Sequence, residues 1–148
     1  MCPAGDMEWS SSAMNDCHYM SNICPQASKL NHVYWEKLES ACRRWANLYG
    51  SIYIVCGPVY NSGKLTTIGT NHAIAVPDGY FKVVITLLEG EENGIGFYYR
   101  NDDERQTMES ASMPIDQVEE MLGYDFFTEL PDEIEKWVET QNKLSSWR

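Results

Sequence analysis

Three polar residues, Asn31, Glu39 and Arg43, recur at helical spacing within one short stretch of the sequence. In an ideal α-helix, Asn31 and Glu39 lie about 80° apart around the axis and about 12 Å apart along it, so they face broadly the same way. Arg43 follows Glu39 at i+4 and extends the same polar strip. An amide oxygen, a carboxylate and a guanidinium on one face are the groups that a magnesium-dependent phosphodiesterase needs to hold a hard cation, its waters and a phosphate.

Ordinary structural explanations exist for the same residues. Asn31 is a favourable N-cap residue, and Glu39 with Arg43 could form an exposed i,i+4 ion pair. Asn22 and Gln26, which precede the strip, could satisfy backbone groups in a loop. Spacing alone leaves both interpretations open.

One amphipathic helix over residues 31–49 is predicted to carry this strip. Its apolar residues recur at three- and four-residue steps, and Gly50 follows as a stop signal. These apolar residues are Trp35, Leu38, Cys42, Trp45 and Tyr49. Residues 1–26 mix glycine, proline and serine with aromatic residues, which indicates an irregular loop region with one short element at residues 19–23.

The rest of the chain predicts strands followed by two short helices. Short apolar runs indicate strands at residues 51–57, 72–76, 80–88 and 95–100. The first run is followed by a predicted loop through Pro58 and residues 61–63, and the short turns between later runs favour antiparallel pairing. Helices are predicted at residues 114–123 and 131–139. This order indicates a single α+β domain over residues 1–148.

Charge and composition limit the function classes. The 11 Lys and Arg residues against 22 Asp and Glu residues give a net charge of −11, which disfavours a protein that coats nucleic acid. A metal-dependent enzyme can still approach a polyanion, because a bound divalent cation dominates the field at the reacting phosphate. No stretch has the roughly 20 apolar residues of a membrane helix, so no membrane contact is expected. The five cysteines form no CxxC pair and are expected to be mostly small core residues.

Several blocks of the sequence resemble the DNA/RNA non-specific endonuclease family, the ββα-metal or His-Me finger nucleases of the Serratia type and the endonuclease G type. These blocks, in the family's order, are MCPAGD at 1–6, SNICPQ at 21–26, LNHVYWEKLE at 30–39 with Arg43 after it, IYIVCGPVY at 52–60, VPDGYFKVV at 76–84 and LGYDFFTELPD at 122–132. The resemblance implies a mainly antiparallel central sheet flanked by helices. It also implies hydrolysis of phosphodiester bonds in DNA and RNA, with contacts to backbone phosphates and with Mg²⁺ as cofactor, or Mn²⁺ or Ca²⁺ in its place.

The resemblance also implies a role for each residue that matches a family position. Asn31 would be the protein ligand of the Mg²⁺, and Glu39 would hydrogen-bond to metal-bound waters. Arg43 would contact the phosphate as charge develops in the transition state, and Asn22 would be a supporting polar residue near the scissile group.

The family's general base is a histidine in an Asp-Arg-Gly-His-Met block, and the given sequence starts at that methionine, Met1. None of His18, His32 and His72 matches the base position, so each is expected to be structural or solvent-facing. The expectation is a weak or inactive nuclease that lacks the N-terminal strands, with an exposed sheet edge that favours self-association, for example as a homodimer. The alternative is an inactive relative that serves as a binding or interaction module. For the full-length protein, the resemblance favours a secreted or periplasmic location.

Overall fold

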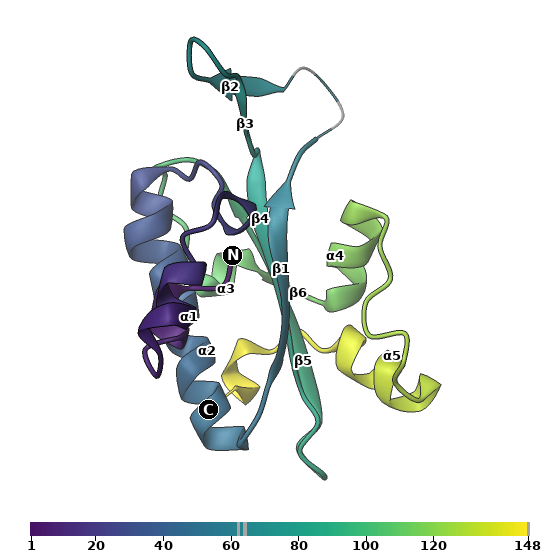
Figure 1. The fold of residues 1–148 in the computed structure, drawn as a ribbon. Helices are drawn as coiled ribbons and strands as arrows, with labels where there is room; N and C mark the ends of the chain where they lie inside the picture. Colours follow the sequence, from purple (N-terminus) through teal and green to yellow (C-terminus); the bar gives the residue numbers. More distant parts are fainter. Residues whose placement is uncertain (62, 64, 148) are drawn as a thin grey trace.

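The computed structural model describes residues 1–61, 63 and 65–147 of the chain. An antiparallel sheet lies at the centre of the domain, with helices on both of its faces (Figure 1). Its strands, in the order in which they lie side by side, are β1 (Tyr53–Val59), β4 (Gly79–Thr86), β5 (Asn93–Arg100) and β6 (Ser112–Met113). This arrangement confirms the α+β class with a mainly antiparallel sheet.

Two groups of helices cover the sheet. One face carries α1 (Ser11–Asp16), η3 (Leu30–Trp35), α2 (Glu36–Tyr49) and α3 (Met108–Ala111), and the other carries α4 (Ile115–Leu122) and α5 (Asp132–Thr140) (Figure 1). Three short 3₁₀ turns are η1 (Ala4–Asp6), η2 (Met20–Asn22) and η4 (Leu144–Ser146). Within the described parts of the chain, no helix combines the length and apolar character needed to cross a membrane.

Strand β4 links two hydrophobic cores, because all of its residues are buried. Tyr80 and Val84 pack on the α2 side together with Trp35, whereas Val83 and Ile85 pack on the side of α4 and α5. Successive side chains of a strand point to opposite faces, so a strand covered on both sides needs apolar residues at almost every position. This double burial explains the continuous apolar run in the sequence.

The long helix forms where the apolar stripe predicts it, with one difference in its first turns. Helical structure begins at Ser28, and residues 30–35 form a π-helical turn before α2 continues to Tyr49. Gly50 ends the helix with a φ of 77°, a conformation that glycine adopts without strain. The N-cap explanation for Asn31 is wrong, because its amide already donates to the Ala27 carbonyl oxygen at 2.9 Å inside the helix.

The strand region differs from the prediction in two places. Pro58 lies inside β1 and not in the following loop, which an edge strand tolerates because its outer side needs no backbone donor. The run at residues 72–76 contributes only β3 (Ile74–Val76), which pairs with β2 (Thr66–Ile68) in a separate hairpin. That hairpin extends beyond one end of the central sheet (Figure 1). Of the predicted loop at residues 61–63, Ser62 lies outside the described residues.

The cysteines are free thiols, and only Cys42 is buried, so the expectation that most of them are core residues is wrong. Cys2 is exposed, and the other three are partly buried. Burial raises the pKa of the Cys42 thiol to about 11. The nearby cation of Lys82 offsets only part of this shift.

Cys42 is therefore expected to be alkylated by iodoacetamide at pH 8 at least about 100-fold more slowly in the native protein than in denaturant, because the thiolate is the reacting form. The measurement is mass spectrometry of peptides after timed alkylation, with the exposed Cys2 as the internal control. Equal early modification of Cys42 and Cys2 in the native protein would contradict the burial of this thiol.

Candidate functional site

A cavity of about 250 Å³ lies beside the first turns of the long helix. Asn22, Asn31 and Glu39 all line it, together with residues 1–3, Gln26 and other neighbours. The structure thus brings together three of the four residues that the sequence singles out. Arg43 is the exception, since it does not line this cavity.

The position of Asn31 depends on the π-helical turn of η3. Such turns have i→i+5 hydrogen bonds, are rare, and are frequently found at functional sites. Asn31 is exposed and Glu39 is partly buried, yet both side chains border the same cavity although they are eight positions apart. Their convergence agrees with the polar strip predicted from the sequence.

The segment just before the helix is held in place by groups from the far end of β5 and from β4. Asn101 donates to the carbonyl oxygens of Pro25 at 3.0 Å and of Pro77 at 2.8 Å, and its own side-chain oxygen accepts from the Ala27 amide at 2.7 Å. The hydroxyl of Tyr80 also donates to the Pro25 carbonyl oxygen, at 2.8 Å. These bonds fix the backbone that carries Gln26 into the cavity wall.

Glu39 lies in an environment of mixed charge. Burial raises the pKa of its carboxyl above the ordinary value, while the cations of Lys82 and Arg43 act in the opposite direction and Asp6 adds to the rise. Lys82 is itself only 2% exposed, on the α2 side of β4. Its ammonium nitrogen lies 4.8 Å from the ring centroid of Trp35, which is a cation–π distance.

Lys82 is a residue that sequence reasoning missed. Within the described residues it forms no ion pair, so a positive charge is buried behind the cavity wall and is stabilised in part by the Trp35 ring. The sequence feature that could have indicated it is a single lysine inside the otherwise apolar run at residues 80–88. Lysine is rarely buried unless an opposite charge lies near it, and the carboxylate of Glu39 is such a charge.

Arg43 is held by a different partner from the one considered in the sequence, and it lines a separate hollow with Asp6 and Cys42. Its Nη1 atom donates to the Asp6 carboxylate at 2.8 Å, and Nη2 donates to the Ser40 hydroxyl at 3.1 Å. The explanation as an ion pair with Glu39 is wrong, since no such pair occurs among the described side chains. Hydrogen bonding to Asp6 raises the pKa of Arg43, so the guanidinium stays charged.

Asn22 uses its side chain to hold the first residues of the chain. Its Oδ1 atom accepts from the Cys2 amide at 2.7 Å, and its Nδ2 atom donates to the carbonyl oxygens of Cys2 at 2.8 Å and Cys17 at 2.9 Å. This agrees with the interpretation that Asn22 satisfies backbone groups. Asn22 thereby builds one wall of the cavity, and its supporting role near a scissile group stays a prediction.

Gln26 has a buried side-chain nitrogen, Nε2, without a hydrogen-bond partner among the described residues. A buried donor left unpaired is unfavourable, so the position suits a ligand that accepts a hydrogen bond. A phosphate oxygen is such an acceptor. The sequence interpretation as a loop residue that bonds the backbone does not account for this nitrogen.

The three histidines are solvent-facing, one of the two situations that the sequence predicts for them. His18 and His32 are exposed, and the Nδ1 atom of each is 3.0 Å from a carbonyl oxygen four residues earlier in the chain. His72 is exposed in the loop that connects β2 to β3. None of the three lines the cavity in the described structure, so none is placed to act there as a base.

The donor groups around the cavity fit a hard divalent cation. Mg²⁺ is usually held by one or two protein oxygens and keeps several waters, and Asn31 and Glu39 offer an amide oxygen and a carboxylate on the same cavity. Asn31 is exposed, Glu39 is partly buried, and both side chains border the cavity. The residues present therefore agree with a cation that carries most of its own water.

A family model described as DNA/RNA non-specific endonuclease matches residues 1–133. The chain belongs to the DNA/RNA non-specific endonuclease family. The match confirms the family inferred from the sequence blocks, and it includes the whole cavity together with α2 and the central sheet.

Curated members of the DNA/RNA non-specific endonuclease family resemble the chain over most of its length. The chain is 32% identical to "Nuclease 1, mitochondrial" of Schizosaccharomyces pombe over 145 residues, which cover 87% of this chain and 45% of that protein. It is 31% identical to "Endonuclease G, mitochondrial" of Homo sapiens over 135 residues, which cover 83% of this chain and 45% of that protein. The chain thus spans about half the length of these relatives.

A solved structure of the EndoG/EndoGI complex has the same fold. The superposition gives a TM-score of 0.83 and covers 96% of this chain and 63% of the other, at 22% sequence identity. This likeness confirms the fold expected for the DNA/RNA non-specific endonuclease family.

Proposed function

We propose that the cavity is the metal- and phosphate-binding part of an endonuclease active site for DNA and RNA. The observation that carries the proposal is the convergence of Asn31, Glu39 and the unpartnered Gln26 on one cavity, in a chain of the DNA/RNA non-specific endonuclease family. Backbone phosphates are common to both nucleic acids and carry no sequence information, so a site built for phosphate accepts both without sequence preference.

Each residue has a role that follows from its surroundings. Asn31 and Glu39 would hold a Mg²⁺ ion and its waters; when bound, this ion supplies positive charge that stabilises the phosphate as its bond to the leaving oxygen breaks. Gln26 would donate its free N–H to a phosphate oxygen. Arg43 would bind a second phosphate oxygen by exchanging its contact with Asp6, which is a partly exposed pair and so costs little to break.

Cleavage also requires a group that takes a proton from the attacking water. A second candidate function is a domain that binds nucleic acid phosphates without cleaving them. Both candidates require the same Asn31-dependent metal site, and they differ only in whether a bond is broken.

The test combines cleavage and binding on the 148-residue protein. Nicking of supercoiled plasmid and anisotropy of a fluorescent single-stranded oligonucleotide are each measured in Mg²⁺ and in a chelator. Asn31→Ala is expected to reduce the Mg²⁺-dependent signal at least about 100-fold, because it removes the proposed protein ligand. Asn142→Ala, an exposed asparagine that does not line the cavity, is the matched control and is expected to behave as the wild type.

The outcomes separate the two candidates. Cleavage that depends on both Mg²⁺ and Asn31 supports the endonuclease, and binding with the same dependence but without cleavage supports the binding module. If both signals are unaffected by Asn31→Ala, or equally affected by Asn142→Ala, the assignment of the cavity is wrong.

A further inference from the structure

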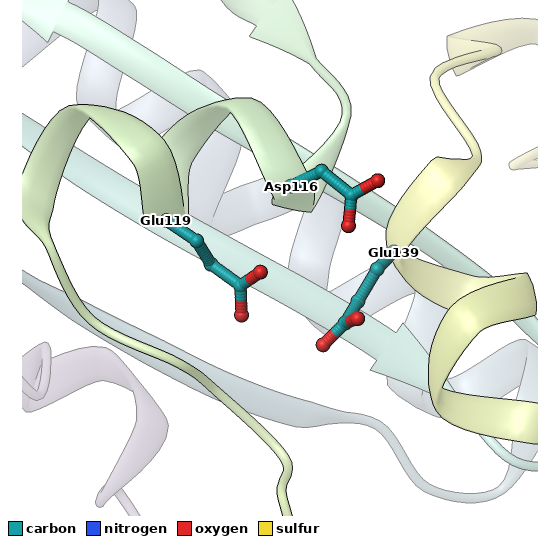
Figure 2. A group of neighbouring side chains, drawn as sticks. All are labelled: Asp116, Glu119 and Glu139. Atoms are coloured by element: carbon teal, nitrogen blue, oxygen red, sulfur yellow. The ribbon is translucent and has the colours of Figure 1, made fainter. Parts of the chain in front are cut away.

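A second cluster of charged residues lies on the other face of the sheet, between α4 and α5. Asp116 and Glu119 extend from α4, and Glu139 extends toward them from α5 (Figure 2). One carboxylate oxygen from each of the three lies within 4.8 Å of the other two. These three residues, which we refer to as the carboxylate cluster, are separated from the candidate nuclease cavity by the sheet (Figure 1).

Glu139 is the unusual member of the carboxylate cluster. It is only 7% exposed, and its Oε1 atom is buried with no hydrogen-bond partner among the described residues. A buried carboxylate without a donor is unfavourable, so buried charges in proteins are normally paired or coordinate a metal ion. The unpartnered oxygen points to a ligand that the protein atoms do not provide.

Basic side chains do not neutralise the carboxylate cluster. The ion pairs of the described residues involve only Arg43 and Arg100 as cations, and neither contacts the cluster. The surroundings add more negative charge, because Asp125 and Glu135 form a second such group with Glu139. The region therefore attracts cations.

The donor set fits calcium better than magnesium, because Mg²⁺ is usually bound by only one or two carboxylates, whereas Ca²⁺ takes six to eight oxygens in a flexible geometry. Two oxygens bound to the same Ca²⁺ at about 2.3–2.6 Å lie at most about 5 Å apart, whereas the shorter bonds of Mg²⁺ limit this separation to about 4 Å. The three carboxylate oxygens of the carboxylate cluster lie within 4.8 Å of one another, which is inside the span that one Ca²⁺ ion allows. Glu119 is also oriented, since its Oε1 atom accepts from the Phe126 amide at 2.6 Å.

Space for further ligands is present beside the carboxylate cluster. An open depression of about 350 Å³ is lined by Asp116, Gln117 and Thr140, together with Pro114 and Glu120. Calcium takes six to eight oxygens, and this depression, which Asp116 lines, is open to water that can supply further ligands.

We propose that Asp116, Glu119 and Glu139 bind a Ca²⁺ ion that joins α4 to α5. The ion would balance the charge of three carboxylates and give the buried oxygen of Glu139 a partner. It would also stabilise the packing of the two helices that cover this face of the sheet.

The competing occupant is a proton. Burial, followed by the charges of Glu119, Glu135, Asp116 and Asp125, raises the pKa of Glu139 to about 8. A protonated Glu139 would also reduce the repulsion in the carboxylate cluster, so the test must tell a bound calcium ion from a retained proton.

The test uses the Asn31→Ala protein, so that a cation in the nuclease cavity does not contribute to the signal. At pH 7.5, calcium chloride added to the chelated protein is expected to raise the melting temperature by about 5 °C or more, with a Kd below about 1 mM by calorimetry. Glu139→Gln in the same background is expected to show neither effect, although without calcium it should melt at or above the parent protein. Glu133→Gln, an exposed position on α5, is the matched control and keeps the full response.

Two further variants identify the ligands. Asp116→Asn is expected to weaken calcium binding at least about 10-fold, and Asp125→Asn is expected to leave it nearly unchanged. The reverse pattern would overturn the assignment of the carboxylate cluster as the ligand set. Absence of calcium binding in the Asn31→Ala protein, or an equal response in Glu139→Gln, would overturn the site and favour the retained proton. Neither result depends on nuclease activity, so the proposed function stands or fails separately.

Discussion

Trp35→Ala is expected to lower the free energy of unfolding by about 3–5 kcal/mol, the usual cost of removing a large aromatic side chain from a core. Trp35 is 2% exposed, and its ring centroid lies 5.7 Å from that of Tyr80 and 6.1 Å from that of Tyr99. The substitution leaves a cavity between the helix and the sheet. It also removes the ring that faces the buried ammonium of Lys82, and with it the cation–π contact.

Urea unfolding followed by circular dichroism measures this effect. Trp9→Ala is the control, because Trp9 is 78% exposed and a surface substitution usually changes stability by less than about 0.5 kcal/mol. A loss below about 1 kcal/mol for Trp35→Ala would show that the ring does not carry the packing described here. Because Trp35 also lines the nuclease cavity, the same variant is expected to weaken oligonucleotide binding under conditions in which it is still folded.

Gly94→Ala is expected to destabilise the domain by about 3 kcal/mol or more. A Cβ atom at Gly94 would lie 2.0 Å from the Val138 carbonyl oxygen and 2.7 Å from the Val138 carbonyl carbon. Both are backbone atoms of α5, so a side-chain rotation cannot relieve the overlap. The helix must move away from β5, and the neighbouring Glu139 must move with it.

Thermal unfolding of Gly94→Ala is compared with that of Gly90→Ala. Gly90 has a φ of 80° but no atom within 4 Å of an added Cβ, so this control carries backbone strain alone, worth about 1–2 kcal/mol. A loss for Gly94→Ala no larger than that for Gly90→Ala would contradict the close approach of α5 to the sheet. Gly94→Ala is also expected to lose the calcium response, because the carboxylate cluster is formed across the contact between α4 and α5.

The parts of the fold that depend on local sequence were predicted well. The stripe through Trp35, Leu38 and Trp45 is a periodic signal within one helix, and Gly50 ends that helix by its own conformational preference. Proline and glycine likewise bracket α4 at Pro114 and Gly123. Each of these signals acts over a few residues and needs no knowledge of the rest of the chain.

The features that were missed depend on residues far apart in sequence. Arg43 pairs with Asp6 and not with its helical neighbour, and that contact exists only because the N-terminal segment folds back onto α2. Lys82 is explained by the ring of Trp35 and the charge of Glu39, which reach it across the interface between helix and sheet. Periodicity cannot indicate such pairs, since it describes one element at a time.

The candidate site contains features that local sequence predicts and features that depend on residues far apart in sequence. Asn31 and Glu39 were placed together from ideal helix geometry, and they do share one cavity. The free nitrogen of Gln26 was not foreseen, because it results from the way Asn101 anchors the preceding loop. The carboxylate cluster was not foreseen either, since it requires the packing of two helices that the sequence predicts only separately.

The π-helical turn at residues 30–35 makes the length of this segment as important as its composition. A π turn accommodates one residue more than an α-helical turn in the same span, so loss of a single residue there would convert it to regular α-helix. Such a deletion would leave the positions on either side of the turn facing as before. Conversion to regular α-helix without a deletion would instead rotate the positions before the turn by about 100° around the helix axis relative to Glu39, and Asn31 would turn away from the cavity although no site residue had changed. Related chains that keep this site are therefore expected either to keep the π turn or to have one residue fewer in it.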